Sequence, residues 1–99
     1  MEGKYINQGV CECLSIFFSL CSPRFREMTA KEIEAESGFK PDKVYRYLKT
    51  LEHMRMVRQC RWNRQWECSP EIVRVADGFV RYVAMKRAEI ETKEHEYLG

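Results

Sequence analysis

The sequence predicts a mostly α-helical fold with one small β-hairpin. Apolar residues recur at three- and four-residue spacing along much of the chain, as on the buried face of a helix. Gly38 and Pro41 mark a tight break between two helical segments, and the short runs VRQCR and QWECS alternate as strands do around a turn at Asn63. With 99 residues, 44% of them hydrophobic, the chain has the size of a single domain, residues 1–99, with a modest core.

The first helix is expected over residues 6–21. Its apolar residues form one stripe that includes Ile6, Val10, Phe17 and Leu20. We expect Ser22-Pro23 to end this helix, because proline disfavours the helical conformation in the residue before it.

Residues 29–55 are predicted to form two helices joined by a tight turn. Thr29 is an N-cap and Glu32 completes a capping box, while Gly38 has the position of a left-handed C-cap. The second of these helices begins at Pro41, a favoured first position, and extends to about Arg55. Its core face is formed by Val44, Tyr47, Leu48 and Leu51.

Residues 57–69 are predicted to form a two-stranded hairpin. If Trp62 pairs with Trp66, then Cys60 pairs with Cys68 and residues 63–65 are the loop, whereas a shift of register would break both pairings. A long C-terminal helix follows over residues 70–89, with a tail, residues 90–99, that frays. Three core helices, a two-stranded wing and a long C-terminal helix together make a winged helix-turn-helix.

Positive charge is concentrated in the middle of the sequence. Residues 39–66 contain eight Lys and Arg residues and two acids, a net charge of +6, although the whole chain has a net charge of only +2. The exposed face of the helix that starts at Pro41 is predicted to have almost no acid to balance it. This segment is therefore where a polyanion is expected to dock.

The segment GFKPDKVYRYLKTLE resembles the recognition-helix region of the isocitrate-lyase-regulator (IclR) type of winged helix. The residues that match are Gly38, Val44, Tyr45, Arg46, Leu48, Thr50 and Leu51, and the wing matches at Val57, Arg58, Trp66, Cys68 and Ser69. The resemblance covers about residues 10–85. It implies a DNA-binding domain. The effector-binding domain of that family is not expected in this chain, and neither is a small-molecule response by the family's route.

The expected DNA contacts come from the recognition helix and the wing. The helix contributes Lys40, Asp42, Lys43, Tyr45, Arg46 and Lys49, and the wing contributes Arg61, Asn63 and Arg64. Arg46 is the best candidate for a guanine, because its guanidinium can bond two acceptors on one base edge. The three lysines suit phosphates better. The family usually has serine or threonine where Asp42 and Lys43 stand here, so base contacts are not carried over to these two positions.

These features predict a sequence-specific double-stranded DNA-binding protein, a small transcriptional regulator that works as a homodimer through its C-terminal helix. The alternative is a winged-helix module that docks an acidic protein partner through the same basic face. For Trp66, packing in the hairpin is a better explanation than DNA contact. For the charged residues at the wing tip, a polar turn exposed to solvent is nearly as good an explanation as DNA contact.

Other classes of function find no support in the sequence. His53 and His95 have no evident catalytic partners, which argues against an enzyme. Cys11 and Cys13 point about 200° apart on a helix and cannot share a metal ion, and no cofactor motif is present. Five cysteines without an export signal predict free thiols in the cytoplasm, with a Cys60–Cys68 disulfide as a minor alternative. By analogy, the compact, effector-free build is that of a prokaryotic or phage-encoded regulator. No membrane association is expected.

Overall fold

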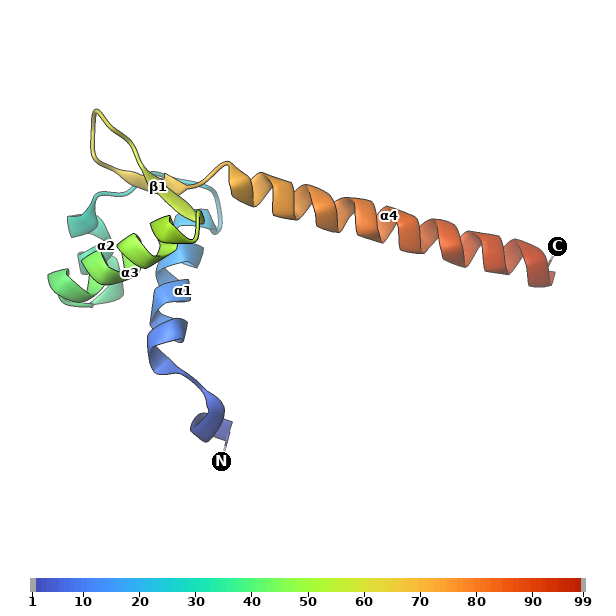
Figure 1. Cartoon of the computed structure of the whole chain (residues 1–99), viewed down its shortest axis with the longest axis horizontal. Helices are drawn as coiled ribbons and strands as arrows, with labels where there is room; N and C mark the ends of the chain where they lie inside the picture. The colour runs from blue at the N-terminus through green and yellow to red at the C-terminus, as the bar shows by residue number, and fades with distance from the viewer. Residues whose placement is uncertain (1, 99) are drawn as a thin grey trace. The chain divides into compact units, whose positions relative to one another are not determined.

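The computed structural model describes residues 2–98 and divides the chain into two compact units, Met1–Ser69 and Pro70–Gly99. The elements of the first unit are a short 3₁₀ turn η1 (Glu2–Tyr5), the helices α1 (Gln8–Cys21), α2 (Ala30–Ser37) and α3 (Pro41–His53), and the strands β1 (Val57–Gln59) and β2 (Trp66–Cys68). The second unit is the helix α4 (Glu71–Leu98) (Figure 1). The mostly helical winged-helix fold is confirmed.

The core of the first unit lies where α1, α2, α3 and the hairpin meet. Its fully buried side chains are Ile16, Leu20, Ile33, Val44, Leu48, Leu51 and Val57. Removing one such side chain from water stabilises the fold by about 1.5–3 kcal/mol. Tyr47, which the sequence placed on the core face of α3, is only partly buried, because its hydroxyl bonds to Glu12.

The local signals around the helix-turn-helix are confirmed in detail. The Thr29 hydroxyl accepts a hydrogen bond from the Glu32 N–H at 3.2 Å, and the Glu32 carboxylate accepts one from the Thr29 N–H at 2.9 Å, which completes the capping box. Gly38 ends α2 with φ 77, the left-handed conformation that glycine adopts without a steric penalty. Pro41 begins α3.

The hairpin register differs from the predicted one. Gln59 pairs with Trp66 and Val57 with Cys68, so Trp62 and Cys60 do not face the residues that the sequence suggested. On the edge of β2 that faces away from β1, Trp66 pairs with Met28. The Met28 N–H donates to the Trp66 carbonyl at 2.9 Å, and the Trp66 N–H donates to the Met28 carbonyl at 2.7 Å. The predicted packing of Trp66 is correct, since it is 4% exposed, but Trp62 is 88% exposed and is not its partner.

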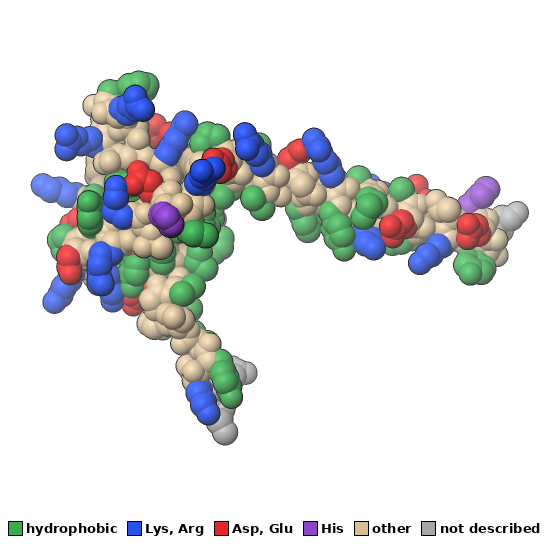
Figure 2. Space-filling model, in the orientation of Figure 1, with side chains coloured by type: hydrophobic (Ala, Val, Ile, Leu, Met, Phe, Trp, Pro, Cys, Tyr) green, Lys and Arg blue, Asp and Glu red, His purple; other side chains and the backbone are tan. Residues whose placement is uncertain are grey.

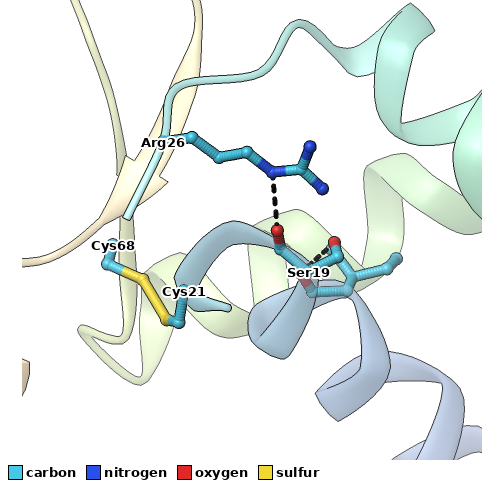
Figure 3. Close-up of a disulfide and its surroundings, with 5 residues drawn as sticks. Ser19, Cys21, Arg26 and Cys68 are labelled. Atoms are coloured by element: carbon cyan, nitrogen blue, oxygen red, sulfur yellow. Dashed lines mark hydrogen bonds between the residues drawn. A yellow bond between two sulfur atoms is a disulfide. The ribbon is translucent and has the colours of Figure 1, made fainter. Parts of the chain in front are cut away.

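A disulfide joins Cys21 at the end of α1 to Cys68 in β2, with 6.5 Å between the Cα atoms (Figure 3). The expectation of free thiols is therefore wrong for this pair, and the alternative bridge from Cys60 is also wrong. Next to the disulfide, the Arg26 guanidinium donates a hydrogen bond to the Ser19 carbonyl at 2.8 Å. Cys11, Cys13 and Cys60 remain free thiols.

The second unit is one amphipathic helix. Helix α4 continues to Leu98, past the point near Glu89 where fraying was expected. None of its described side chains is buried, and most of its large apolar residues, Phe79 and Ile90 among them, are 40–84% exposed. The described helices include none that is both long enough and apolar enough to span a membrane.

Candidate nucleic-acid interface

The predicted contact residues of α3 gather on the side of the helix that faces away from the core. Asp42, Tyr45, Arg46 and Lys49 are all exposed, while Val44 and Leu48 hold the opposite side in the core. A shallow hollow of ≈ 440 Å³ at the start of α3 is lined by Gly38, Phe39, Lys40, Asp42, Lys43 and Arg46. Four of the predicted site residues therefore share one concave surface.

Lys43 is held by an acidic residue from another helix. Its ammonium lies 2.8 Å from the Glu12 carboxylate of α1, and the Tyr47 hydroxyl donates to the same carboxylate oxygen at 2.7 Å. The hydrogen bond from Lys43, followed by that from Tyr47, lowers the pKa of Glu12, and the same contacts raise the pKa values of Lys43 and Tyr47. The ammonium also lies 5.5 Å from the centre of the Phe39 ring, within cation–π range.

Two further cations of this region are paired. Lys49 lies 2.7 Å from the Glu52 carboxylate, and this hydrogen bond raises the pKa of Lys49. Arg58 in β1 lies 2.7 Å from Glu67 in β2. Arg46, in contrast, has no ion-pair partner among residues 2–98.

The expectation of a helix face with almost no acid is therefore wrong. Glu12 and Glu67 lie outside the segment 39–66 in the sequence, but the fold brings them against Lys43 and Arg58. Glu52 lies inside the segment and is folded back onto Lys49. What remains available for a polyanion is a smaller set, made up of Lys40, Arg46, Arg61 and Arg64.

The wing tip exposes Arg61, Asn63 and Arg64, as well as Trp62. Asn63 shapes this turn, because its side-chain oxygen accepts a hydrogen bond from the Gln65 N–H at 2.9 Å. Arg64 adopts a left-handed conformation with φ 56, and its N–H donates to the Cys60 carbonyl at 3.0 Å. In Figure 2, Lys and Arg side chains project from the hairpin and from the part of the first unit that holds α3.

The sequence did not indicate the acids that organise this surface. Glu12 belongs to no motif and stands in a helix that is recognised by its apolar stripe. Helical periodicity places Tyr47 on the core face of α3, and so gives no sign of its bond to Glu12. The only available signal was for Glu52, which stands three residues after Lys49, a spacing at which helix side chains meet.

No protein-family model matches the sequence, and a comparison with curated proteins gives no match. Solved structures are similar in fold. An IclR transcriptional regulator from Alicyclobacillus acidocaldarius superposes with a TM-score of 0.65 at 22% identity, over 72% of this chain and 28% of that one. The IclR-family regulator from Brucella abortus gives 0.63 at 19% identity, over 75% and 28%.

A third structure, from Silicibacter sp. TM1040 and described as an ICLR transcriptional regulator, gives a TM-score of 0.68 at 22% identity, over 84% of this chain and 32% of that one. The chain thus spans about a third or less of the length of these proteins. The predicted resemblance is confirmed at the level of architecture: the chain has the winged-helix fold of IclR-type transcriptional regulators.

Proposed function

We propose that this protein binds double-stranded DNA in a sequence-specific manner and acts as a small transcriptional regulator. Helix α3 enters the major groove, and the wing contacts the backbone or the minor groove. The observation that carries the proposal is the exposed Arg46 on α3, which no carboxylate neutralises among the described residues, in a fold shared with transcriptional regulators.

The contacts divide into two kinds. Arg46, with Tyr45 beside it, is suited to base edges, and a bidentate contact from arginine to guanine contributes about 1–3 kcal/mol of discrimination. Lys40, Arg61 and Arg64 supply positive charge for phosphates, and Asn63 keeps the wing tip in shape. Lys43 and Lys49 reach phosphates only if they give up their carboxylate partners.

The test starts from a duplex selected out of a random pool by the protein. Fluorescence anisotropy then measures its affinity between about 50 and 200 mM salt, where phosphate contacts give a steep linear fall of log K with log salt. Arg46→Ala is expected to weaken binding about tenfold or more and to relax the preference at one base pair. The matched control is Lys93→Ala, which removes one exposed cation from α4. It is expected to leave both the affinity and the base-pair preference unchanged.

A shallow salt dependence, together with equal affinities for Arg46→Ala and the unmodified protein, would contradict DNA recognition. It would favour the alternative in which the same surface docks an acidic protein.

We infer further that two copies pair through α4. At 100° per residue, Ile72, Phe79, Val83 and Ile90 fall within a narrow stripe, and Phe79, Val83 and Ile90 are 40–66% exposed. A helix of 28 residues is about 42 Å long, enough for several layers of side chains between two helices. A two-fold dimer also matches two half-sites about one DNA turn apart.

Sedimentation at tens of micromolar tests the dimer. Phe79→Glu is expected to give monomers, whereas Thr92→Glu, the same kind of change on the opposite side of α4, is expected to leave the dimer intact. A monomer for the unmodified protein, both free and on DNA, would exclude this assembly.

A further inference from the structure

Glu12 and Lys43 form the most enclosed ion pair on the surface proposed for DNA. The Glu12 side chain is only 16% exposed, and that of Lys43 is 38% exposed. By comparison, Lys49 and Glu52 keep 50% and 37% of their side-chain surfaces exposed. The two lysines of α3 are therefore not equivalent, although both stand among the basic residues of the same helix.

The position of Lys43 on α3 explains this difference. Taking 100° per residue, Lys43 lies on the flank of α3 next to Tyr47, and Lys49 lies on the opposite flank. The flank of Lys43 faces α1, which supplies Glu12, and the Phe39 ring covers the ammonium from another side. Phe39 in turn packs edge-on against Tyr47, with 6.1 Å between the ring centres.

Releasing Lys43 toward a phosphate has a clear cost. Glu12, whose side chain is 16% exposed with Lys43 in place, would keep the Tyr47 hydroxyl as its remaining partner from α3. A partly enclosed carboxylate that loses its cation is less stable, and near DNA it would also repel the phosphates. A phosphate offers Lys43 only an exposed, salt-screened contact in exchange.

We propose that Lys43 remains paired with Glu12 when the protein is on DNA, so that Glu12 withholds this lysine from the phosphates and fixes α3 against α1. The inference rests on the proposed DNA-binding function. Glu12 is a positioning residue: it sets how many phosphates the recognition helix neutralises. Lys43, which the sequence grouped with the phosphate-binding lysines, belongs to the support of the helix.

The salt dependence of binding distinguishes these roles, because each neutralised phosphate adds about 0.9 to the slope of log K against log salt. Glu12→Gln frees Lys43 and is expected to steepen the slope by about 0.9. Lys43→Met is expected to keep the slope of the unmodified protein, and so is the double variant Glu12→Gln/Lys43→Met. Tyr47→Phe is the matched control, since it loosens the same α1–α3 contact without freeing a charge, and its slope is expected to stay unchanged.

Two results would overturn the inference: a slope for Glu12→Gln equal to that of the unmodified protein, or a slope for Lys43→Met shallower by about 0.9. The second result decides the matter even if Glu12→Gln does not fold. Failure of the proposed function has a different signature, because the unmodified protein itself would then lack steep salt-dependent binding to any selected duplex.

Discussion

Lys49 and Glu52 form an ion pair of 2.7 Å within one turn of α3. The pair lies on the exposed side of the helix, so a phosphate that approaches Lys49 competes with a carboxylate that is already in place.

Removal of this competitor should strengthen DNA binding. Glu52→Gln is expected to raise the affinity for a selected duplex several-fold at low salt, measured by fluorescence anisotropy, because Lys49 becomes available for a phosphate. Glu89→Gln is the matched control, since Glu89 pairs with Lys86 at the same i,i+3 spacing in α4. Equal gains for the two variants would mean that only the net charge matters.

The core contact of α3 should dominate the stability of the first unit. Leu48 is 1% exposed, and Leu48→Ala is expected to lower the free energy of unfolding by about 2–5 kcal/mol, through lost burial and a residual cavity. Urea denaturation followed by circular dichroism measures this change. Met54→Ala, at a residue that is 63% exposed at the end of the same helix, should change the free energy of unfolding by less than about 0.5 kcal/mol.

The Cys21–Cys68 disulfide should stabilise the protein mainly by restricting the unfolded chain. It closes a loop across a sequence separation of 47 residues, for which the chain-entropy relation gives about 4 kcal/mol. Reductant is therefore expected to shift the urea midpoint to lower concentration, and Cys60→Ser should leave the midpoint unchanged. Thiol titration of the denatured, unreduced protein should detect Cys11, Cys13 and Cys60 only. Five reactive thiols would contradict the bridge.

The Glu12 cluster should stabilise the fold over a defined pH window. The pKa of Glu12 is lowered, chiefly by the hydrogen bond from Lys43 and then by those from Tyr47 and Gln8, so its contribution is present above the ordinary carboxyl pKa. That contribution is lost as the pH falls through the lowered value. The pKa of Lys43 is raised by Glu12, so its contribution is lost as the pH rises through the raised value.

Melting temperatures measured against pH should show this window. The advantage of the unmodified protein over Glu12→Gln/Lys43→Met is expected to be constant between about pH 5 and 10 and to shrink at both ends. A difference that does not vary from pH 3 to 11 would show that the pair adds no charge-dependent stability.

The fold could be predicted from the sequence wherever local chemistry decides the structure. Thr29 with Glu32, Gly38 and Pro41 each fix a helix end through contacts within a few residues, and all of them are where the sequence placed them. The predicted hairpin register was wrong, because alternation along two short strands does not fix which residues pair. The connection runs over residues 60–65, closed by the hydrogen bond from the Cys60 N–H to the Gln65 carbonyl, and is longer than the expected loop at residues 63–65.

In the candidate site too, local patterns predict some features and only the tertiary packing decides the others. The exposed position of Arg46 follows from helical periodicity, since Val44 and Leu48 must face the core. Helical periodicity does not show which lysines are paired with carboxylates, because Glu12 contacts Lys43 only once α1 has packed on α3. The disulfide was missed for a similar reason, since the fold, and no motif, brings Cys21 to Cys68.

The two tryptophans give the protein a pair of built-in optical probes. Trp66 is buried at 4% exposure and reports on the integrity of the core, whereas Trp62 at the wing tip is 88% exposed and meets the solvent. Iodide quenching of the intrinsic emission therefore arises mainly from Trp62, and a partner that covers the wing would reduce that quenching while leaving the Trp66 signal in place. Unfolding and wing contact can thus be followed separately in one unlabelled sample.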